Sequence, residues 1–498
     1  MAAIKIDIND LMDRSGVNFG TSGVRGLVAD MTDEVCFAYV TAFLQYLQQQ
    51  KLIAKTTKIG IAGDLRSSTP RIMNAAAAAC LNMGFEPINA GNIPSPAIAL
   101  YGLKHSIPSI MVTGSHIPDD RNGIKFNTPL GEILKPDEEG IRAQQVTVPK
   151  DLFLNANLIQ TDCLAAVDTN AETNYVQRFI DFLPPNCLQG QQLGLYEHSS
   201  VSRDCLKSIL QKLGANVTSL ARTDTFMPVD TEAIRPEDIT LAKQWSEQYK
   251  FDCIISTDGD GDRPLVSDEK GNWLRGDVAG ILCAKYLGAE SVITPVSSNS
   301  AVEKSGYFTE VIRTKIGSPY VIEAMQAAAA GSGKHVVGYE ANGGFLQQTP
   351  LKQNDNILSP LPTRDAVIVP LAIILLAKQE QLTIAELLMT LPQRYTHSDR
   401  IKEFSTLLSQ KIISKLTKGD MDEQNVTIQS YFNMVGEPKS INTTDGLRIT
   451  FKNNDIVHLR PSGNAPELRC YTESDSQQQA EELNIKAIDV LRNFSKLS

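Results

Sequence analysis

One pattern occurs three times along this chain and constrains its fold more than any other feature. It consists of a strand, a serine-containing loop, a helix, a glycine and a second strand, and its copies begin with the expected strands 58–62, 193–196 and 292–296. A strand, a covering helix and a further strand form the unit from which sheets with packed helices are built. Repetition of such a unit indicates repeated domains. The sequence therefore predicts three related α/β domains.

The C-terminal part departs from this pattern and predicts a smaller α+β domain. Residues 448–451 and 456–459 are expected to pair as strands, and residues 477–493 place apolar side chains at helical spacing. A chain of 498 residues is long enough for about three to four domains. The expected domains are residues 1–155, 156–270, 271–385 and 386–498.

Composition and charge argue against several classes of protein. The net charge of −10 disfavours a general nucleic-acid or anionic-membrane surface. The first residues contain no apolar signal segment, and the longest apolar run, 366–377, is too short to cross a bilayer. The eight cysteines form no CxxC pair, as expected of reduced thiols. We therefore expect a cytoplasmic protein without nucleic-acid or membrane partners.

The segment Thr113-Gly114-Ser115-His116-Ile117-Pro118 ends a run of strand-forming residues. Gly114 is expected to let the backbone bend, and Lys125 returns a positive charge after a second turn. A serine at the end of a buried strand can carry a phosphoryl group if cations and a metal ion share the charge. The alternative is an ordinary strand-to-loop turn with a surface serine.

Three aspartates, Asp258, Asp260 and Asp262, alternate with glycines directly after the expected strand 253–257. Carboxylates at this spacing can converge on one hard cation, Mg²⁺ or Ca²⁺, and would repel each other without it. An EF-hand loop is a rival, but its glycine position holds Arg263 and a strand precedes it. A solvated acidic turn is the other alternative. Arg263 is placed to hold a phosphoryl group that the metal also touches.

Three further loops combine cations with glycines or hydroxyl groups, which suits phosphate. The segment 19–26 places Arg25 after two glycines and a Thr-Ser pair. The segment 313–318 holds two cations, one of them Lys315, before an expected helix. The alternative is a flexible N-terminal loop for segment 19–26, a segment without a ligand for 313–318, and a surface turn for the third loop. The third loop offers Arg460, Ser462, Gly463, Asn464 and Arg469.

Glu340 and Asn342 lie on a glycine-containing turn after the expected strand 335–337. A carboxylate and an amide in such a turn can hydrogen-bond neighbouring sugar hydroxyls. A polar turn without a ligand is the alternative.

Four of these stretches together resemble a known family. Thr-Gly-Ser-His-x-Pro with Asn-Gly-x-Lys, Asp-Gly-Asp-Gly-Asp-Arg, Glu-Ala-Asn-Gly-Gly and Arg-Pro-Ser-Gly-Asn-x-Pro occur here in the order and spacing of the α-D-phosphohexomutases. The resemblance covers nearly the whole chain. It implies three α/β domains and a smaller last domain around a central cleft, which agrees with the repeats.

The resemblance also implies roles for individual residues. Ser115 would be the phosphoserine, and its phosphoryl oxygen would complete a Mg²⁺ site with Asp258, Asp260 and Asp262. The transfer site would be lined by Arg25, Arg263 and Lys125, with Lys125 and His116 near the proton chemistry. Sugar hydroxyls would be bound by Glu340 and Asn342. The distal phosphate would be held by Arg460, Ser462, Gly463, Asn464 and Arg469.

The implied reaction interconverts a hexose 1-phosphate and a hexose 6-phosphate through a hexose 1,6-bisphosphate, which is both intermediate and activator. The serine and arginine loops look most similar to bacterial phosphomannomutases, so mannose 6-phosphate and mannose 1-phosphate are the expected pair. The alternatives are a phosphoglucomutase and a phosphoglucosamine or acetylglucosamine mutase. A metal-dependent sugar phosphatase and a non-catalytic phosphosugar-binding protein are further alternatives. We expect a monomer or homodimer.

Three positions depart from the family pattern. Asn342 stands where serine is common, Ile117 stands where asparagine is common, and Gly344 stands where some members carry a histidine proposed as acid or base. The first departure weakens any substrate assignment from that loop, and the last leaves the general base open.

Overall fold

The computed structural model of the chain describes residues 3–353, 355–462 and 466–496. By their internal contacts the residues form two compact units. The first unit comprises Met1–Ser291 and Gly317–Leu387, and the second comprises Val292–Ile316 and Leu388–Ser498. Each unit has its own hydrophobic core. The four domain boundaries and the central cleft stay predictions.

The first sheet positions the Ser115 loop. Its strand order is β2 (Asn18–Phe19), β3 (Gly23–Leu27), β7 (Arg121–Thr128), β6 (Ser109–Val112), β4 (Lys58–Gly63) and β5 (Glu86–Asn92), with β8 (Gly131–Glu132) on β7. Strand β4 runs parallel to β5 and β6, whereas β7 is antiparallel to both β6 and β3. Because β4 and β6 are parallel neighbours, the loops that follow them meet at one edge of the sheet.

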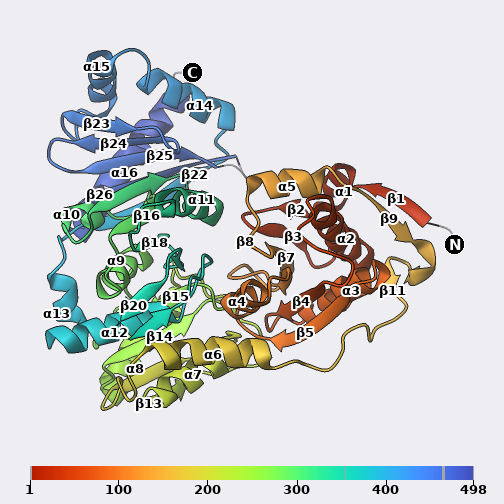
Figure 1. The fold of residues 1–498 in the computed structure, drawn as a ribbon. Coiled ribbons are helices and arrows are strands. Elements are labelled where there is room, and N and C mark those ends of the chain that lie inside the picture. The colour runs from red at the N-terminus through yellow and green to blue at the C-terminus, as the bar shows by residue number, and fades with distance from the viewer. Residues whose placement is uncertain (1–2, 354, 463–465, 497–498) are drawn as a thin grey trace. The chain divides into compact units, whose positions relative to one another are not determined.

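Helices cover both faces of this sheet. α2 (Asp33–Gln49) and α3 (Thr69–Asn82) lie on one face and α4 (Ser95–His105) on the other (Figure 1). The hydroxyl of Thr32 caps α2 by accepting a hydrogen bond from the amide of Val35 at 3.3 Å. The rest of this region comprises β1 (Ala3–Asp7), α1 (Ile8–Ser15), α5 (Lys135–Arg142), β9 (Gln145–Pro149), a 3₁₀ turn (Lys150–Leu152), β10 (Phe153–Leu154) and β11 (Asn157–Leu158).

The second sheet positions the aspartate loop. Its order is β13 (Asn216–Leu220), β12 (Gln192–Tyr196), β14 (Cys253–Thr257) and β15 (Pro264–Val266), accompanied by α6 (Asn170–Phe182), α7 (Arg203–Lys212) and α8 (Pro236–Tyr249). Strand β12 is parallel to β13 and β14, and β15 is antiparallel to β14. The predicted second repeat is therefore confirmed as β12, α7 and β13. All five residues of β14 are buried, which anchors the loop that follows it.

The division between the units passes through the third α/β region. The first unit holds α9 (Gly276–Tyr286), α11 (Ser318–Ala329), β18 (Val336–Tyr339), β19 (Phe345–Gln347), β20 (Leu351–Gln353), β21 (Asn356–Leu358) and α12 (Ile368–Glu380). At or beyond the division lie β16 (Ser291–Pro295), α10 (Ala301–Lys304), β17 (Glu310–Thr314) and α13 (Ile384–Met389). The apolar run 366–377 is buried, and it comprises the first ten residues of α12 and the two residues before the helix. Within the described residues no helix is long and apolar enough to span a membrane.

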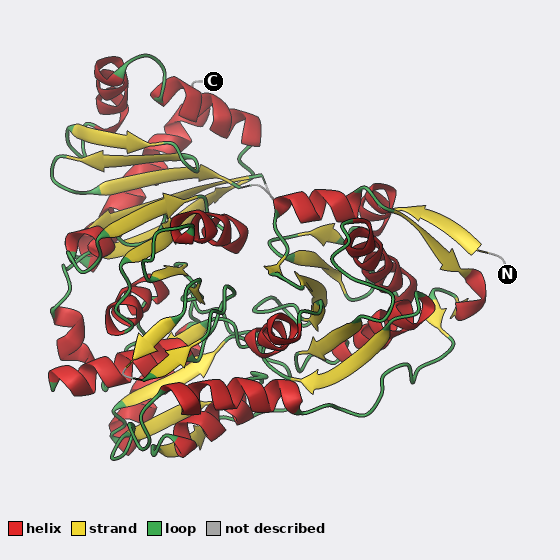
Figure 2. Ribbon diagram, viewed as in Figure 1, coloured by secondary structure: helices red, strands yellow, loops and turns green. Residues whose placement is uncertain are grey.

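The C-terminal part of the second unit is an antiparallel sheet with helices (Figure 2). The strand order is β22 (Tyr395–Lys402), β26 (Glu467–Ser474), β25 (Ile456–Pro461), β24 (Leu447–Phe451) and β23 (Pro438–Asn442). α14 (Thr406–Leu416), α15 (Met421–Phe432) and α16 (Gln477–Lys496) share one core with it. The predicted pair of strands is confirmed as β24 and β25, and the predicted smaller α+β domain is thereby observed.

A buried histidine in this sheet makes stability depend on pH. His458 is 1% exposed, and its Nε2 donates a hydrogen bond to the carbonyl oxygen of Asp445 at 2.7 Å. Burial lowers the pKa of His458 to about 4. The unfolded chain therefore takes up a proton near the ordinary pKa, before the folded one does, and stability present above pH 6.5 is lost as the pH falls towards 4.

We expect the unfolding free energy to be about 2 kcal/mol lower at pH 5 than at pH 7.5 because of His458. Thermal unfolding of the wild type and of His458→Gln at both pH values measures this, because glutamine keeps a donor but cannot be protonated. His198, whose pKa burial also lowers to about 4, remains in both proteins. An unchanged pH dependence in the variant would contradict the assignment.

Candidate active site

The Ser115 side chain is buried and points to the aspartate loop. Its Oγ donates a hydrogen bond to Oδ2 of Asp258 at 2.7 Å, and the residue is 1% exposed. Its backbone is left-handed, with φ of 55°. The Ser115 amide donates to Oγ1 of Thr113 at 2.7 Å, and that hydroxyl donates to Oδ2 of Asp64 at 2.7 Å. The predicted surface-turn alternative for Ser115 is therefore wrong.

Arg66, which follows β4, holds the Ser115 loop in this shape. Its guanidinium donates hydrogen bonds to the backbone carbonyls of Ser115, Ile117, Pro118 and Arg121 at 2.6–3.0 Å. Its Nε donates to Oδ2 of Asp64 at 3.1 Å. A Cβ at position 114 would lie 2.6 Å from Cζ of Arg66. Gly114 thus provides room for Arg66, whereas the bend itself lies at Ser115, which corrects the predicted role of Gly114.

We expect Arg66→Met to lower the unfolding free energy by about 3–5 kcal/mol, because it leaves Asp64 as a buried charge without its cation. Both side chains are inaccessible to solvent. Arg71→Met is the matched control, since Arg71 pairs with Asp33 at 2.6 Å but is 35% exposed. Thermal unfolding of the two variants compares them, and equal losses would contradict the special position of Arg66.

The three predicted metal ligands converge. Asp258, Asp260 and Asp262 are buried, and one oxygen from each lies within 4.8 Å of the others. The loop joins the antiparallel strands β14 and β15, so the EF-hand alternative is wrong. Oδ1 of Asp260 and Oδ1 of Asp262 are buried without a hydrogen-bond partner. Buried carboxylates that converge within 4.8 Å and retain oxygens without a hydrogen bond fit a hard divalent cation.

Charge around the triad is partly balanced by Lys125. Its Nζ lies 2.6 Å from Oδ2 of Asp260 and 2.7 Å from Oδ2 of Asp262. Burial and the two neighbouring carboxylates raise the pKa of Asp258 well above its ordinary value. Burial acts in the same direction on Asp260, but the Lys125 ammonium outweighs it and lowers the pKa of that carboxyl.

Arg25 and Lys125 stand on one face of the paired strands β3 and β7, each opposite a glycine. Gly123 pairs with Arg25, and Gly23 pairs with Lys125. A Cβ at position 123 would lie 2.9 Å from Cγ of Arg25, and one at position 23 would lie 2.0 Å from a backbone oxygen. Burial and the nearby Arg263 lower the pKa of Arg25. The two cations therefore share the face from which Lys125 reaches the triad.

Arg263 and His116 complete the surroundings of Ser115. Nε of Arg263 lies 4.0 Å from Oδ2 of Asp258 and 3.7 Å from Oδ1 of Asp262. Its Nη1 donates a hydrogen bond to Nδ1 of His116 at 2.9 Å, and that nitrogen lies 3.3 Å from Oγ of Ser115. Burial and Arg263 lower the pKa of His116 to about 4. The ring is therefore neutral at pH 7, with Nδ1 as an acceptor.

The predicted sugar-binding turn joins β18 to β19. Glu340 and Asn342 are 4% and 9% exposed. Oδ1 of Asn342 accepts a hydrogen bond from the amide of Gly344 at 2.9 Å, which closes the turn. Oε2 of Glu340 accepts from Nε of Arg364 at 2.7 Å. Arg364 was not among the predicted site residues because it lies in no recognisable motif.

In the second unit, Asp445 connects two predicted phosphate loops. Its Oδ2 accepts hydrogen bonds from Nε of Arg460 at 2.8 Å and from the amide of Ile316, next to Lys315, at 3.0 Å. Ser462 is 5% exposed, and its amide donates to the carbonyl oxygen of Glu467 at 2.9 Å. Two predicted residues, Gly463 and Asn464, lie outside the described residues.

Strand register gathers three arginines in this unit. Arg469 on β26 lies opposite Arg460 on β25 and opposite Arg400 on β22. Like charges directly opposite each other destabilise a sheet unless anions balance them. Nε of Arg460 is bonded to Asp445, and Nη1 of Arg400 lies 3.5 Å from Glu467. The row is suited to a phosphate dianion. Arg400 was missed because the pairing of β22 with β26 is not evident from sequence.

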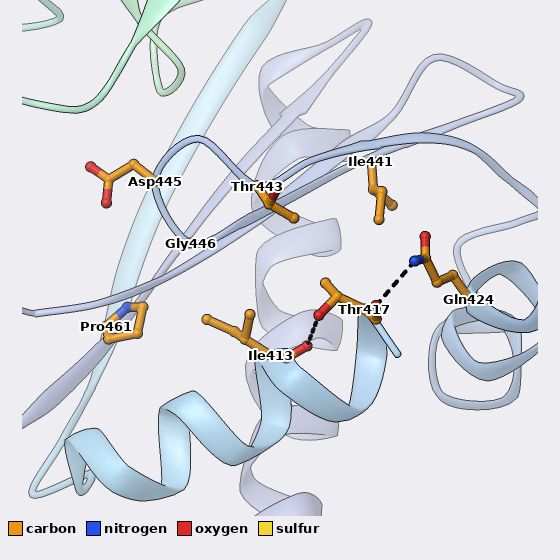
Figure 3. A pocket seen from close by; sticks show the side chains of 8 residues that line it. All are labelled: Ile413, Thr417, Gln424, Ile441, Thr443, Asp445, Gly446 and Pro461. Atoms are coloured by element: carbon orange, nitrogen blue, oxygen red, sulfur yellow. Dashed lines mark hydrogen bonds between the residues drawn. The ribbon is translucent and has the colours of Figure 1, made fainter. Parts of the chain in front are cut away.

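A pocket of 650 Å³ lies in the second unit (Figure 3). It lies between α14, the turn that joins β23 to β24, and the end of β25. Asp445 therefore borders both the pocket and Arg460. Its lining residues are Ile413, Thr417, Gln424, Ile441, Thr443, Asp445, Gly446 and Pro461.

Comparison with protein families gives four consecutive matches. They are described as phosphoglucomutase/phosphomannomutase alpha/beta/alpha domain I (residues 16–148), domain II (156–271), domain III (275–395) and C-terminal domain (414–489). All of the predicted site residues fall within the matched ranges.

Individual proteins match over nearly the whole chain. A phosphomannomutase of Salmonella muenchen is 45% identical over 471 residues, 95% of each chain. A phosphomannomutase of Sinorhizobium fredii is 39% identical over 96% of this chain and 99% of its own. The crystal structure of a phosphoglucomutase/phosphomannomutase family protein from Burkholderia thailandensis has a TM-score of 0.72 and 18% identity, covering 95% of this chain and 97% of its own. This last likeness concerns the fold.

Proposed function

Because the chain belongs to the phosphoglucomutase/phosphomannomutase family, we propose that it interconverts a hexose 1-phosphate and a hexose 6-phosphate, with mannose as the preferred hexose. One observation supports this most strongly: the Ser115 hydroxyl lies 2.7 Å from a carboxylate of the buried aspartate triad. A phosphoryl group on that oxygen would sit among metal ligands and cations. Mannose is favoured because two phosphomannomutases are 45% and 39% identical to this chain, whereas a phosphoglucosamine mutase that covers 94% of it is 26% identical.

We propose that Mg²⁺ is held by Asp258, Asp260, Asp262 and an oxygen on Ser115. The buried carboxylate oxygens of Asp260 and Asp262 that accept no hydrogen bond support this assignment. When bound, the ion neutralises charge that develops on the transferred phosphoryl group. Lys125 and Arg263 already lie against the same carboxylates, and with Arg25 they would hold the phosphoryl oxygens.

His116 is the proposed proton acceptor for the attacking sugar hydroxyl, once its Nδ1 has released the hydrogen bond that it accepts from Arg263. Its neutral Nδ1 lies 3.3 Å from Oγ of Ser115, and Gly344 has no side chain that can compete for the proton. Lys125 is unsuited to this role. Burial alone would lower its pKa, but Asp260 and Asp262 together raise it, so its ammonium stays charged.

The remaining predicted residues would bind substrate. Glu340 and Asn342 would bind sugar hydroxyls, and the distal phosphate would be bound by Lys315, Arg460, Ser462, Gly463, Asn464 and Arg469. Phosphoserine would give its group to a hexose monophosphate, and the hexose 1,6-bisphosphate would reorient and return its other phosphate to Ser115. The bisphosphate would therefore also prime the enzyme. The oligomeric state of the protein, which we expect to be a monomer or a homodimer, stays a prediction.

A panel of sugar phosphates tests the proposal. Mannose, glucose, glucosamine and N-acetylglucosamine 1-phosphates are each incubated with the protein, Mg²⁺ and a trace of hexose 1,6-bisphosphate. We expect the 6-phosphate to form fastest from mannose 1-phosphate, without inorganic phosphate. Inorganic phosphate as the only product would indicate a phosphatase, and no turnover of any sugar would contradict the mutase assignment.

A further inference from the structure

A single buried arginine contacts several parts of the site in the first unit. Arg364 is 4% exposed. Its Nε donates to Oε2 of Glu340 at 2.7 Å, its Nη1 donates to Oδ2 of Asp262 at 3.3 Å, and its Nη2 donates to Oγ of Ser318 at 3.1 Å. The Ser318 hydroxyl in turn donates to Oε2 of Glu132 at 2.6 Å. One planar guanidinium therefore joins the sugar-binding turn to a proposed metal ligand.

The chain is shaped to hold Arg364 in this place. A Cβ at position 344 would lie 2.5 Å from Cδ and 2.8 Å from Cγ of Arg364. The arginine stem thus passes directly over Gly344, and any side chain there would displace it. Burial of a guanidinium is costly unless carboxylates compensate it, and here two carboxylates accept hydrogen bonds from it. Space and charge together hold the Arg364 guanidinium between Glu340 and Asp262.

We propose that Arg364 is a positioning residue that couples Glu340 to the metal site. If Glu340 loses its charge, Arg364 is held less strongly on that side and its charge is drawn towards Asp262, where it competes with a metal ion. Conversely, a metal ion that occupies Asp262 leaves Arg364 free to fix Glu340 for the sugar. The sugar part of this inference rests on the proposed function, whereas the link between Glu340 and the metal does not.

The coupling is measured with the metal alone, so that no turnover is needed. Mg²⁺ binding to the dephosphorylated full chain is titrated calorimetrically in the wild type, Glu340→Gln, Arg364→Met and the double variant. We expect Glu340→Gln to weaken Mg²⁺ binding about tenfold in the wild type but only about twofold in the Arg364→Met background. The direct effect of the lost Glu340 charge on Mg²⁺ binding is present in both backgrounds. It therefore cancels when the two fold-changes are compared.

Two further variants separate position from charge. Arg364→Lys keeps a positive charge but cannot donate to two carboxylates through a planar fork, so the coupling should fall as in Arg364→Met. Gly344→Ala displaces the arginine stem and keeps its charge, so it should also reduce the coupling, and it serves if Arg364→Met does not fold. Equal weakening of Mg²⁺ binding by Glu340→Gln in all backgrounds would overturn the proposal, as would full coupling in Arg364→Lys.

The same proteins separate failure of this proposal from failure of the proposed function. A wild-type protein without mutase turnover would contradict the proposed function and would leave the Mg²⁺ titrations interpretable. With turnover present, Arg364→Met should raise the KM for mannose 1-phosphate by a larger factor than it lowers kcat, because Glu340 is proposed to bind the sugar and not the transferred group. A larger change in kcat than in KM would also contradict a positioning role.

Discussion

Replacing Ser115 by alanine is expected to lower kcat by about 10⁴-fold or more, because the variant lacks the oxygen that would carry the phosphoryl group. The change removes one hydrogen bond, that from Oγ to Asp258, and leaves the loop supported by Arg66 through backbone carbonyls. We therefore expect the fold to persist. Steady-state turnover of mannose 1-phosphate, with circular dichroism as a check of folding, measures the effect.

Ser67→Ala is the matched control, since Ser67 is an exposed serine beside Arg66. This variant should keep wild-type turnover. Turnover within tenfold of the wild type in Ser115→Ala would show that another residue carries the phosphoryl group.

Asp260→Asn is expected to lower kcat on the order of 10³-fold by weakening the metal site. Asp260 offers one unpartnered buried oxygen, and its other oxygen accepts hydrogen bonds from Lys125 and Ser95 at 2.6 Å. An amide of the same size keeps the packing but removes the negative charge. Turnover measured as a function of Mg²⁺ concentration should show a weaker apparent affinity as well as a lower maximum.

Asp120→Asn is the control for this variant, because Asp120 is an exposed aspartate near the Ser115 loop. Removal of divalent ions with EDTA should abolish wild-type turnover. In EDTA the turnover of Asp260→Asn should be no lower than that of the wild type. Full turnover of the wild type in EDTA would contradict a metal-dependent reaction.

Ser115 and the three aspartates were predictable from sequence because their motifs follow strands, whereas Arg25 lies within β3 and not in the predicted loop. Ser115 follows β6 and the aspartates follow β14, and both strands are buried. The end of a buried strand fixes where the next side chains lie, so their convergence could be expected. Lys125 was predictable for a different reason: the turn before it returns the chain, so that β7, which contains Lys125, runs antiparallel to β6.

The supporting residues could not be predicted, because their roles depend on contacts between distant segments. Arg66 and Arg364 lie outside the recognised motifs. The carbonyl partners of Arg66 and the Asp262 partner of Arg364 lie far away in the sequence. The role of Gly114 was wrong for a similar reason: its requirement for space comes from the Arg66 side chain. Asp445 lies in the segment that joins β23 to β24, whose residues alone do not indicate a bond to Arg460.

One measurement tests most directly that Ser115 is the phosphoryl carrier of a mutase. The protein is first labelled with ³²P by incubation with a labelled hexose 1,6-bisphosphate, and the remaining bisphosphate is then removed. The labelled protein is mixed with unlabelled mannose 1-phosphate and an excess of Mg²⁺ for a single turnover. The account predicts that the label leaves Ser115 and appears in mannose 1,6-bisphosphate and mannose 6-phosphate. Label that appears as inorganic phosphate, or that remains on the protein, would contradict it.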